Sequence, residues 1–362
     1  MKTDKTYMKQ ALLLAKKGLG RTAPNPPVGA VVVRQGRVVG KGFHPRAGMP
    51  HAEIYALRDA GDTSRGATMY VTLEPCSHYG KTPPCTHALI EAGIKKVVVG
   101  TVDPNPVVAG KGIEFLRSHG IEVLVGIEKE AAEELIKWYA FWMKSRRPFV
   151  IAKAAMTLDG RIAAPGGDSK WISSQESRIF VHALRNHTDG ILVGIGTVLC
   201  DDPELTCRIE GGRDPLRIVL DRDFQIPPSA RVLGERCLIF TARDPEARPE
   251  ITVTGTDVVR LLLDGSGRFA WGDILEYLGS KGLHAVLVEG GKGVHSGLIK
   301  SGNANKLLFF VAPKLLGGGI PLVGWEGPER IADACPLVIT QVKTIGCDVL
   351  IEASPGESCS QD

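Results

Sequence analysis

The sequence predicts two α/β domains, each with a largely parallel sheet covered by helices on both faces. The chain has 362 residues, and one hydrophobic core rarely grows beyond about 250–300 residues. Strand-like and helix-like segments alternate along both halves, as is typical of parallel sheets. The alternation breaks once, at residues 145–149, where Pro148 disfavours a helix before it. We therefore expect one domain at residues 1–147 and another at residues 148–362.

The first domain is expected to begin with an amphipathic helix. Its apolar stripe at helical spacing consists of Tyr7, Met8, Ala11, Leu12 and Ala15. Strands are expected at 29–33, 68–73, 95–100 and 121–126, and a turn and a second apolar segment, 38–42, follow the first strand. Helices are expected at 51–61, 85–93, 112–120 and 128–143. The helix at 51–61 ends in Gly61, a common C-terminal cap.

The second domain restarts the alternation. Strands are expected at 149–156, 190–194, 216–221, 237–240, 284–291 and 306–313. One helix is expected from Ser174 to about Asn186, and another after Gly291. The last residues, 354–362, resemble a frayed tail.

Composition excludes several classes of protein. Hydrophobic residues make up 43% and charged residues 23%, which excludes a disordered chain, a collagen-like fibre and a small disulfide scaffold. A net charge of +4 is too weak to indicate nucleic-acid binding by itself. No apolar run reaches the roughly 18 residues of a membrane span, and the N-terminal run ALLLA is shorter than a signal-peptide core. We expect a cytoplasmic protein whose eight cysteines are metal ligands or buried apolar residues rather than disulfides.

Four residues of the first half form the clearest chemical motif: His51, Glu53, Cys76 and Cys85. Two thiolates and one imidazole suit a tetrahedral Zn²⁺ whose fourth position stays open. Glu53 lies two residues from the histidine and is placed to move a proton. His-x-Glu followed by Pro-Cys is the signature of zinc deaminases, in which the second cysteine follows after two residues; here it follows after eight. The alternative is a structural zinc, which usually has four protein ligands, or two unrelated cysteines.

Residues 1 to about 146 resemble the deaminase half of the bifunctional riboflavin biosynthesis proteins. The resemblance rests on APNPPVGAVVV at 23–33, HAE at 51–53, EPCSHYGKTPPC at 74–85 and VDPNP at 102–106. It implies a three-layer α/β/α, cytidine-deaminase-like fold with Glu53 as the catalytic residue. It also implies a substrate pocket lined by Asn25, His44, His78, Lys81, Asp103 and Asn105. Taken alone, Asn25 and Asn105 equally fit Asn-Pro turns.

Two glycine-bearing turns of the second half lie between a strand and a helix. They are Gly194–Gly196 and Gly290–Gly293. Such turns place backbone N–H groups and a helix N-terminus at a phosphate, which favours a bound dinucleotide. The first turn lacks the last glycine of G-x-G-x-x-G, because Leu199 stands there. Plain turn glycines are the alternative in a chain with 43 glycines.

From Phe149 on, the sequence resembles the reductase half of the same family, which is related in fold to dihydrofolate reductase. The resemblance rests mainly on AKAAMTLDGRIA at 152–163, GDSKWISS at 167–174, LVGIGTVLCDDPELTCR at 192–208 and VEGGKGVHSGLI at 288–299. It implies NADPH contacts at Ala154, Trp171, Thr197, Asp201, Gly290, Gly291, Lys292 and Gly293. It implies substrate contacts at Ser169, Arg185, Leu205, Arg208 and Glu289, and proton-handling roles for Lys153 and Asp201. We also assign Arg222, beside a strand end, to the 2′-phosphate of NADPH.

The expected function is a bifunctional enzyme of riboflavin synthesis. The first step is zinc-dependent hydrolytic deamination of 2,5-diamino-6-(5-phosphoribosylamino)pyrimidin-4(3H)-one. The second is NADPH-dependent reduction of the ribosyl group, giving 5-amino-6-(5-phosphoribitylamino)uracil. The family also implies a homo-oligomer, a dimer or tetramer, and we expect neither a nucleic-acid nor a membrane partner. Two alternatives stay open: a nucleic-acid-editing deaminase, and a deaminase whose second half binds a ligand without chemistry.

Overall fold

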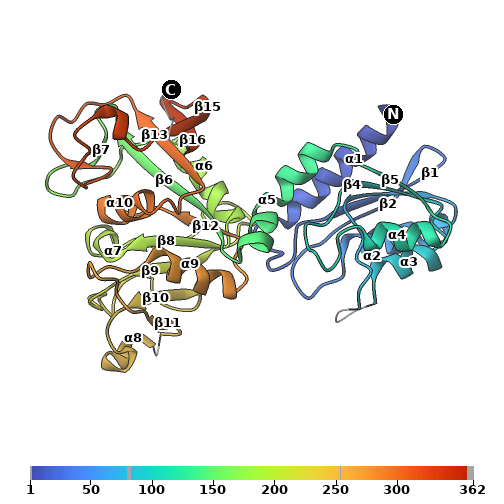
Figure 1. The fold of residues 1–362 in the computed structure, drawn as a ribbon, viewed down its shortest axis with the longest axis horizontal. Helices are drawn as coiled ribbons and strands as arrows, with labels where there is room; N and C mark the ends of the chain where they lie inside the picture. The colour runs from blue at the N-terminus through green and yellow to red at the C-terminus, as the bar shows by residue number, and fades with distance from the viewer. Residues whose placement is uncertain (1, 80–82, 253, 357–362) are drawn as a thin grey trace. The chain divides into compact units, whose positions relative to one another are not determined.

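The computed structural model describes residues 2–79, 83–252 and 254–356. The chain divides into two compact units, Met1–Arg146 and Arg147–Asp362. Each unit is built on its own sheet (Figure 1). No helix of the described residues is both long enough and apolar enough to cross a membrane.

The first unit contains a five-stranded sheet in the order β2-β1-β3-β4-β5. Its strands are β1 (Gly29–Arg34), β2 (Arg37–Phe43), β3 (Thr68–Leu73), β4 (Lys96–Thr101) and β5 (Glu122–Val125). Its helices are α1 (Lys2–Ala15), α2 (Ala52–Ala60), α3 (Cys85–Glu91), α4 (Lys111–Ser118) and α5 (Lys129–Ser145). Short 3-10 helices follow α1 at Lys16–Gly18 and α2 at Gly61–Ser64.

Helices cover both faces of this sheet, which confirms the three-layer architecture. Successive strand residues point to opposite faces, so Val32 packs with α2, α3 and α4 while its neighbour Val31 packs with α1 and α5. The predicted apolar stripe of α1 faces the sheet, since Met8, Ala11, Leu12 and Ala15 are buried.

The expectation of a largely parallel sheet is only partly met in this unit. Strands β3, β4 and β5 are parallel, whereas β1 is antiparallel to both β2 and β3. The reason lies in the turn between β1 and β2. Gln35 and Gly36 both have positive φ, 50° and 75°, as a two-residue hairpin turn requires. A hairpin leaves no room for the crossover helix that parallel pairing needs.

The second unit contains a nine-stranded sheet in the order β11-β10-β9-β8-β12-β6-β13-β16-β15. Its strands are β6 (Phe149–Thr157), β8 (Gly190–Gly194), β9 (Leu216–Leu220), β10 (Cys237–Thr241), β11 (Asp257–Arg260), β12 (Ala285–Val288), β13 (Lys306–Ala312), β15 (Leu337–Ile345) and β16 (Asp348–Pro355). Two short strands, β7 (Arg161–Ala163) and β14 (Ile320–Pro321), pair separately. The helices are α6 (Gln175–His187), α7 (Ile195–Asp201), α8 (Pro249–Thr252), α9 (Trp271–Ser280) and α10 (Lys292–Lys300), with 3-10 turns at Pro245–Ala247 and Ile331–Asp333.

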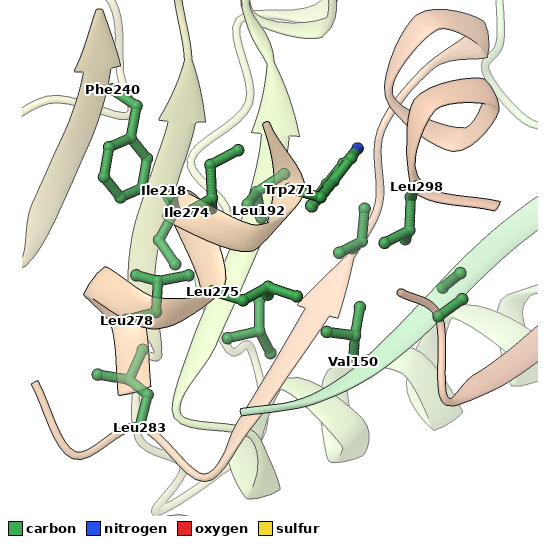
Figure 2. Packing of buried hydrophobic residues seen from close by; sticks show 14 of the residues in the cluster. Val150, Leu192, Ile218, Phe240, Trp271, Ile274, Leu275, Leu278, Leu283 and Leu298 are labelled. Atoms are coloured by element: carbon green, nitrogen blue, oxygen red, sulfur yellow. The ribbon is translucent and has the colours of Figure 1, made fainter. Parts of the chain in front are cut away.

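The core of the second unit lies mainly between the sheet and α9. Ile274, Leu275 and Leu278 of α9 pack against Leu192 and Ile218 on the strands (Figure 2). Burying a side chain of this size contributes about 1.5–3 kcal/mol. Helix α6 packs on the strands elsewhere, where the rings of Phe180 and Phe310 lie edge to face, 5.8 Å apart.

Several elements of this unit were not expected from the sequence, among them strand β11 and the short elements β7, β14 and α8. Helix α9 was not expected. The antiparallel hairpin β15–β16 was not expected either, and it extends the otherwise parallel sheet at β13. Its strand β16 runs to Pro355, so the first two residues of the expected tail belong to the sheet, and residues 357–362 lie outside the described chain.

Candidate active sites

The proposed zinc ligands converge at the N-termini of two helices in the first unit. His51 is the N-cap of α2 and Cys85 is the first residue of α3. Cys76 lies in the loop after β3. The ligand atoms of the three residues lie within 4.8 Å of one another. His51 Nδ1 is 3.6 Å from Cys76 Sγ and 3.4 Å from Cys85 Sγ.

These distances fit zinc. Zn–N bonds of about 2.0–2.1 Å and Zn–S bonds of about 2.3 Å at tetrahedral angles place nitrogen and sulfur about 3.6 Å apart. The backbone N–H of Cys85 donates to Cys76 Sγ at 3.3 Å, so the start of α3 stabilises a thiolate there. Three ligands leave a fourth position for water or substrate, which is the pattern of catalytic rather than structural zinc.

The three side chains perturb one another's pKa values. Hydrogen bonding to Cys85 and His51 lowers the pKa of Cys76 to about 4, against the effect of burial. Hydrogen bonding to Cys76 raises the pKa of His51 to about 9. The hydrogen bond to Cys76 raises the pKa of the Cys85 thiol, and burial adds to the effect. A metal ion would displace these protons on binding.

Glu53 lies in the first turn of α2 and is 3% exposed. Burial raises the pKa of its carboxyl group to about 7, although the nearby His51 acts in the opposite direction. A hydrogen bond with the Cys85 side chain also lowers the pKa of this carboxyl group. A carboxyl group with such a pKa can accept and return a proton near neutral pH.

Asn25 and His44 form a pair beside the metal cluster. His44 is 1% exposed, and its ring lies edge-on to that of His51, with centroids 5.4 Å apart. Because the carbonyl of Pro50 can only accept, His44 Nδ1 carries the proton and donates to it at 3.0 Å. His44 Nε2 then accepts from Asn25 Nδ2 at 3.1 Å. Burial lowers the pKa of His44, which keeps the ring neutral.

Asp103 and Asn105 lie on the loop after β4. Asp103 Oδ1 accepts from the backbone N–H of Asn105 at 2.8 Å and from the hydroxyl of Tyr139 at 3.2 Å. His78 is exposed and close enough to influence the pKa of Asp103, which burial raises. Lys81, the remaining predicted pocket residue, lies outside the described residues.

Two residues of this site were missed by sequence analysis, Tyr139 and Glu74. Tyr139 lies on α5, 36 positions from Asp103, and its spacing with buried Ala132 and Ile136 is that of an ordinary core face. Glu74 is buried directly after β3. The sequence signal that could have identified Glu74 was its position two residues before Cys76, a proposed zinc ligand.

The two glycine turns of the second unit lie next to each other. A Cβ atom at Gly290 would lie 2.4 Å from Val294 Cβ, and one at Gly194 would lie 2.8 Å from the Cγ2 atom of the same valine. A Cβ at Gly291 would lie 3.9 Å from Thr197 Oγ1. The turn after β8 and the turn after β12 therefore face one another, as the carboxyl ends of neighbouring parallel strands do. Glycine backbone there fits the pyrophosphate of a dinucleotide.

A charged triad whose side chains are only 11–15% exposed lies beside these turns, formed by Lys153, Arg185 and Glu289. Arg185 Nε and Nη2 donate to the two carboxylate oxygens of Glu289 at 2.9 and 3.1 Å, and Lys153 Nζ is 3.6 Å from Glu289 Oε2. Burial alone would raise the pKa of Glu289, but the two cations outweigh it and lower this pKa to about 2. Burial lowers the pKa of Lys153, with Glu289 opposing it.

The remaining predicted residues of the reductase half take varied positions. Asp201 ends α7, where its carboxylate lies 3.7 Å from Lys170 Nζ. The Trp171 ring is stacked under the guanidinium of Arg178, 4.6 Å away. Arg208 pairs with Glu204 at 3.1 Å, and Arg222 pairs with Asp223 at 2.7 Å. Ala154 and Leu205 are buried, Ser169 is partly exposed, and Lys292 and Gly293 are exposed at the start of α10.

Two family models match the chain. The RibD C-terminal domain matches residues 148–351. The zinc-binding region of cytidine and deoxycytidylate deaminases matches residues 1–101.

Relatives and solved structures match over nearly the whole length. The riboflavin biosynthesis protein RibD of Aquifex aeolicus is 44% identical, with 96% of this chain and 97% of the relative covered. That of Escherichia coli is 39% identical, with 96% and 98% covered. The crystal structure of a diaminohydroxyphosphoribosylaminopyrimidine deaminase/5-amino-6-(5-phosphoribosylamino)uracil reductase from Thermotoga maritima superposes with a TM-score of 0.87 at 43% identity, covering 98% and 99% of the two chains. Acinetobacter baumannii RibD gives 0.89 at 37% identity, with the same coverage.

These matches confirm the expected fold classes and the expected cofactors, zinc and NADPH. They favour neither an editing deaminase nor a non-catalytic second half, because both halves match one family over the full chain. The chain belongs to the RibD family of riboflavin biosynthesis proteins.

Proposed function

We propose that this chain catalyses two successive reactions on one phosphorylated pyrimidine. The first deaminates 2,5-diamino-6-(5-phosphoribosylamino)pyrimidin-4(3H)-one. The second reduces the ribosyl group of the product to ribityl. One observation carries the proposal: a His51–Cys76–Cys85 cluster of zinc geometry with buried Glu53 beside it, in a chain that also holds the Lys153–Arg185–Glu289 triad.

In the first reaction, water replaces the 2-amino group and ammonia leaves. His51, Cys76 and Cys85 would hold zinc, which supplies a Lewis acid that activates water near neutral pH. Glu53 accepts the proton of the attacking water and donates it to the departing amine. Asn25, Asp103 and Asn105 offer donors and acceptors for the edge of the pyrimidine ring. We assign His78 and Lys81 to contacts with the phosphate, as the family resemblance implies.

In the second reaction, C1 of the opened ribosyl group receives a hydride and the adjoining heteroatom receives a proton. The two glycine turns would hold NADPH, which supplies a hydride when bound. Lys153 is the better placed of the two proposed proton donors. Its side chain is only 15% exposed and its ammonium faces Glu289, whereas Asp201 pairs with the exposed Lys170. Ser169 and Arg208 contact the ribose phosphate, while Arg185 holds Glu289 in place through two parallel hydrogen bonds.

We assign deamination to residues 1–147 and reduction to residues 148–362. We also infer a cytoplasmic location, because a zinc site with two thiolates requires reduced cysteines. Homo-oligomer formation is supported by the edge strand β15, whose Val338, Ile339 and Val342 are more than half exposed. Long apolar edge strands are usually covered by another chain or by another element. Light scattering of the purified protein measures the mass, and a monomer at micromolar concentration would refute this assignment.

Two single variants test the proposal together. Glu53→Gln is expected to abolish ammonia release and to leave NADPH oxidation with the deaminated intermediate intact. Lys153→Met is expected to do the reverse. Because each variant retains one active half, mixing the two should restore conversion of the diaminopyrimidine to the ribityl product. A mixture that stays inactive, with both variants folded, would show that the residues do not have the separate roles proposed.

A further inference from the structure

Glu74 is a buried carboxylate with an unusual number of backbone donors. It follows β3 directly, is 4% exposed, and stands two residues before Cys76. Its Oε2 accepts from the N–H groups of Asp103 at 3.2 Å and Gly110 at 2.9 Å. Its Oε1 accepts from those of Gly112 at 2.9 Å and Ile113 at 3.3 Å. Four donors on one carboxylate are the kind of charge-assisted contact that holds two segments firmly.

The segment that Glu74 holds is the loop from Asp103 to the first turn of α4. Helix α4 begins at Lys111 and receives no cap from the side chain of its own N-cap residue. Glu74 instead satisfies the N–H groups of Gly112 and Ile113, which have no partner within the helix. The same carboxylate binds the backbone of Asp103, whose side chain orients Asn105 and meets Tyr139.

The two segments also touch through their backbones. A Cβ atom at Gly112 would lie 2.1 Å from the carbonyl oxygen of Pro75 and 3.2 Å from Glu74 Oε1. Only glycine therefore permits the start of α4 to approach the residues that lead into Cys76. Glu74 N donates to the carbonyl of Thr101 at 3.0 Å, which ties the same residue to the end of β4.

We propose that Glu74 is a positioning residue of the deaminase site: its carboxylate fixes the loop carrying Asp103 and Asn105 in register with the chain that presents Cys76. The inference rests on the proposed function, because Asp103 and Asn105 are its substrate contacts. It adds a link between the pyrimidine-binding loop and the metal-binding chain. A displacement of about 1 Å in such a loop can reduce turnover by about 100-fold.

An isosteric substitution separates positioning from simple stabilisation. Glu74→Gln keeps the side-chain volume but replaces one carboxylate oxygen by an NH₂ group. The two backbone N–H groups that donated to that oxygen then face another donor and lose their acceptor. Tyr70→Phe is the matched control in the same unit, since it removes a single hydrogen bond, from Tyr70 to Asp4 at 2.6 Å. Three properties are measured in both variants: kcat and KM for deamination, zinc per chain, and NADPH oxidation with the deaminated intermediate as an internal control. Hydrogen exchange of the amides of residues 103–113 is measured as a readout independent of activity.

For Glu74→Gln, kcat/KM for deamination should fall by about 10- to 100-fold, mostly through a higher KM. Zinc content and NADPH oxidation should match the wild type, and the amides of Gly110, Gly112 and Ile113 should exchange faster. Tyr70→Phe should leave KM and this exchange unchanged. Unchanged KM and exchange in Glu74→Gln would overturn the inference, and so would a loss of activity that follows loss of zinc. A wild-type chain that does not deaminate the pyrimidine refutes the proposed function instead, while the exchange data still test the link.

Discussion

Neutralising Glu289 should destabilise the second unit by an amount that depends on pH. Glu289→Gln keeps the side-chain shape but removes the charge that lies between Arg185 and Lys153. The two buried cations then lose their shared partner, and breaking a buried pair typically costs about 3–5 kcal/mol.

The pKa of Glu289 gives a separate measure of how much its charge stabilises the second unit. It is about 2 in the folded chain against an ordinary value of 4.5, a difference equivalent to about 3 kcal/mol. Because the folded pKa is lowered, this stabilisation is fully present above pH 4.5 and is lost as the pH falls through 2. At pH 7 the free energy of unfolding of the wild type should therefore exceed that of Glu289→Gln by about 3 kcal/mol. This difference should shrink as the pH falls from 4.5 to 2.

Denaturant unfolding at a series of pH values measures this difference directly. In thermal unfolding at pH 7, a loss of about 3 kcal/mol corresponds to a decrease in Tm of about 6–12 °C for a unit of this size. Glu276→Gln is the matched control, because Glu276 forms an exposed pair with Arg147 and such pairs contribute about 0–1 kcal/mol. A Glu289→Gln protein as stable as the control at pH 7, or a difference that does not change with pH, would show that the Glu289 charge does not stabilise the second unit.

Three further changes have definite expected outcomes. Cys85→Ser removes one of the three proposed zinc ligands, so metal analysis after dialysis should find well under one zinc per chain; full occupancy would contradict the proposed ligand set. Leu278→Ala leaves a cavity at a fully buried position of α9. It should lower the free energy of unfolding in denaturant by about 2–5 kcal/mol, whereas a change below 1 kcal/mol would mean that neighbouring side chains fill the cavity. Gly112→Ala favours a helix by intrinsic propensity, yet its Cβ would meet the Pro75 carbonyl at 2.1 Å; we expect a lower Tm for the first unit, and a higher one would show that this close approach does not exist.

The clustering of His51, Cys76 and Cys85 could be predicted because their residue types and order along the chain follow a zinc-deaminase motif, although the three lie up to 34 positions apart. His51 and Glu53 are two residues apart, Cys76 follows a predicted strand, and Cys85 begins a predicted helix. The geometry adds what the motif alone does not contain, namely nitrogen–sulfur distances of 3.4 and 3.6 Å. The family resemblance supplied most pocket residues, such as Asn25 and Asp103.

Glu74 and Tyr139 could not be predicted in the same way. The hydrogen bonds that give them roles join residues 29 to 39 positions apart, so their function depends on how loops pack after folding. Arg185 illustrates the same limit. The family resemblance implied a substrate contact for Arg185, and in the structure its guanidinium binds the Glu289 carboxylate through two hydrogen bonds.

The direction of the strands at the sheet edges could not be predicted from the alternation of strands and helices either. The β1–β2 hairpin depends on positive φ angles at Gln35 and Gly36. The types of these two residues suggest such angles but do not require them. Hairpin β15–β16 contains exposed apolar residues on its outer strand, so it lacks the polar alternation by which an edge strand is recognised.

The central claim, two consecutive reactions in one chain, is tested most directly by the mass of the product. The purified protein is incubated with the diaminopyrimidine ribosyl phosphate and NADPH, and the product is analysed by mass spectrometry. Deamination should raise the mass by about 1 Da and reduction by about 2 Da more, so we expect a combined rise of about 3 Da. A rise of only 1 Da would contradict a reductase role for the Lys153 triad on this substrate, and no change would contradict the pyrimidine assignment itself.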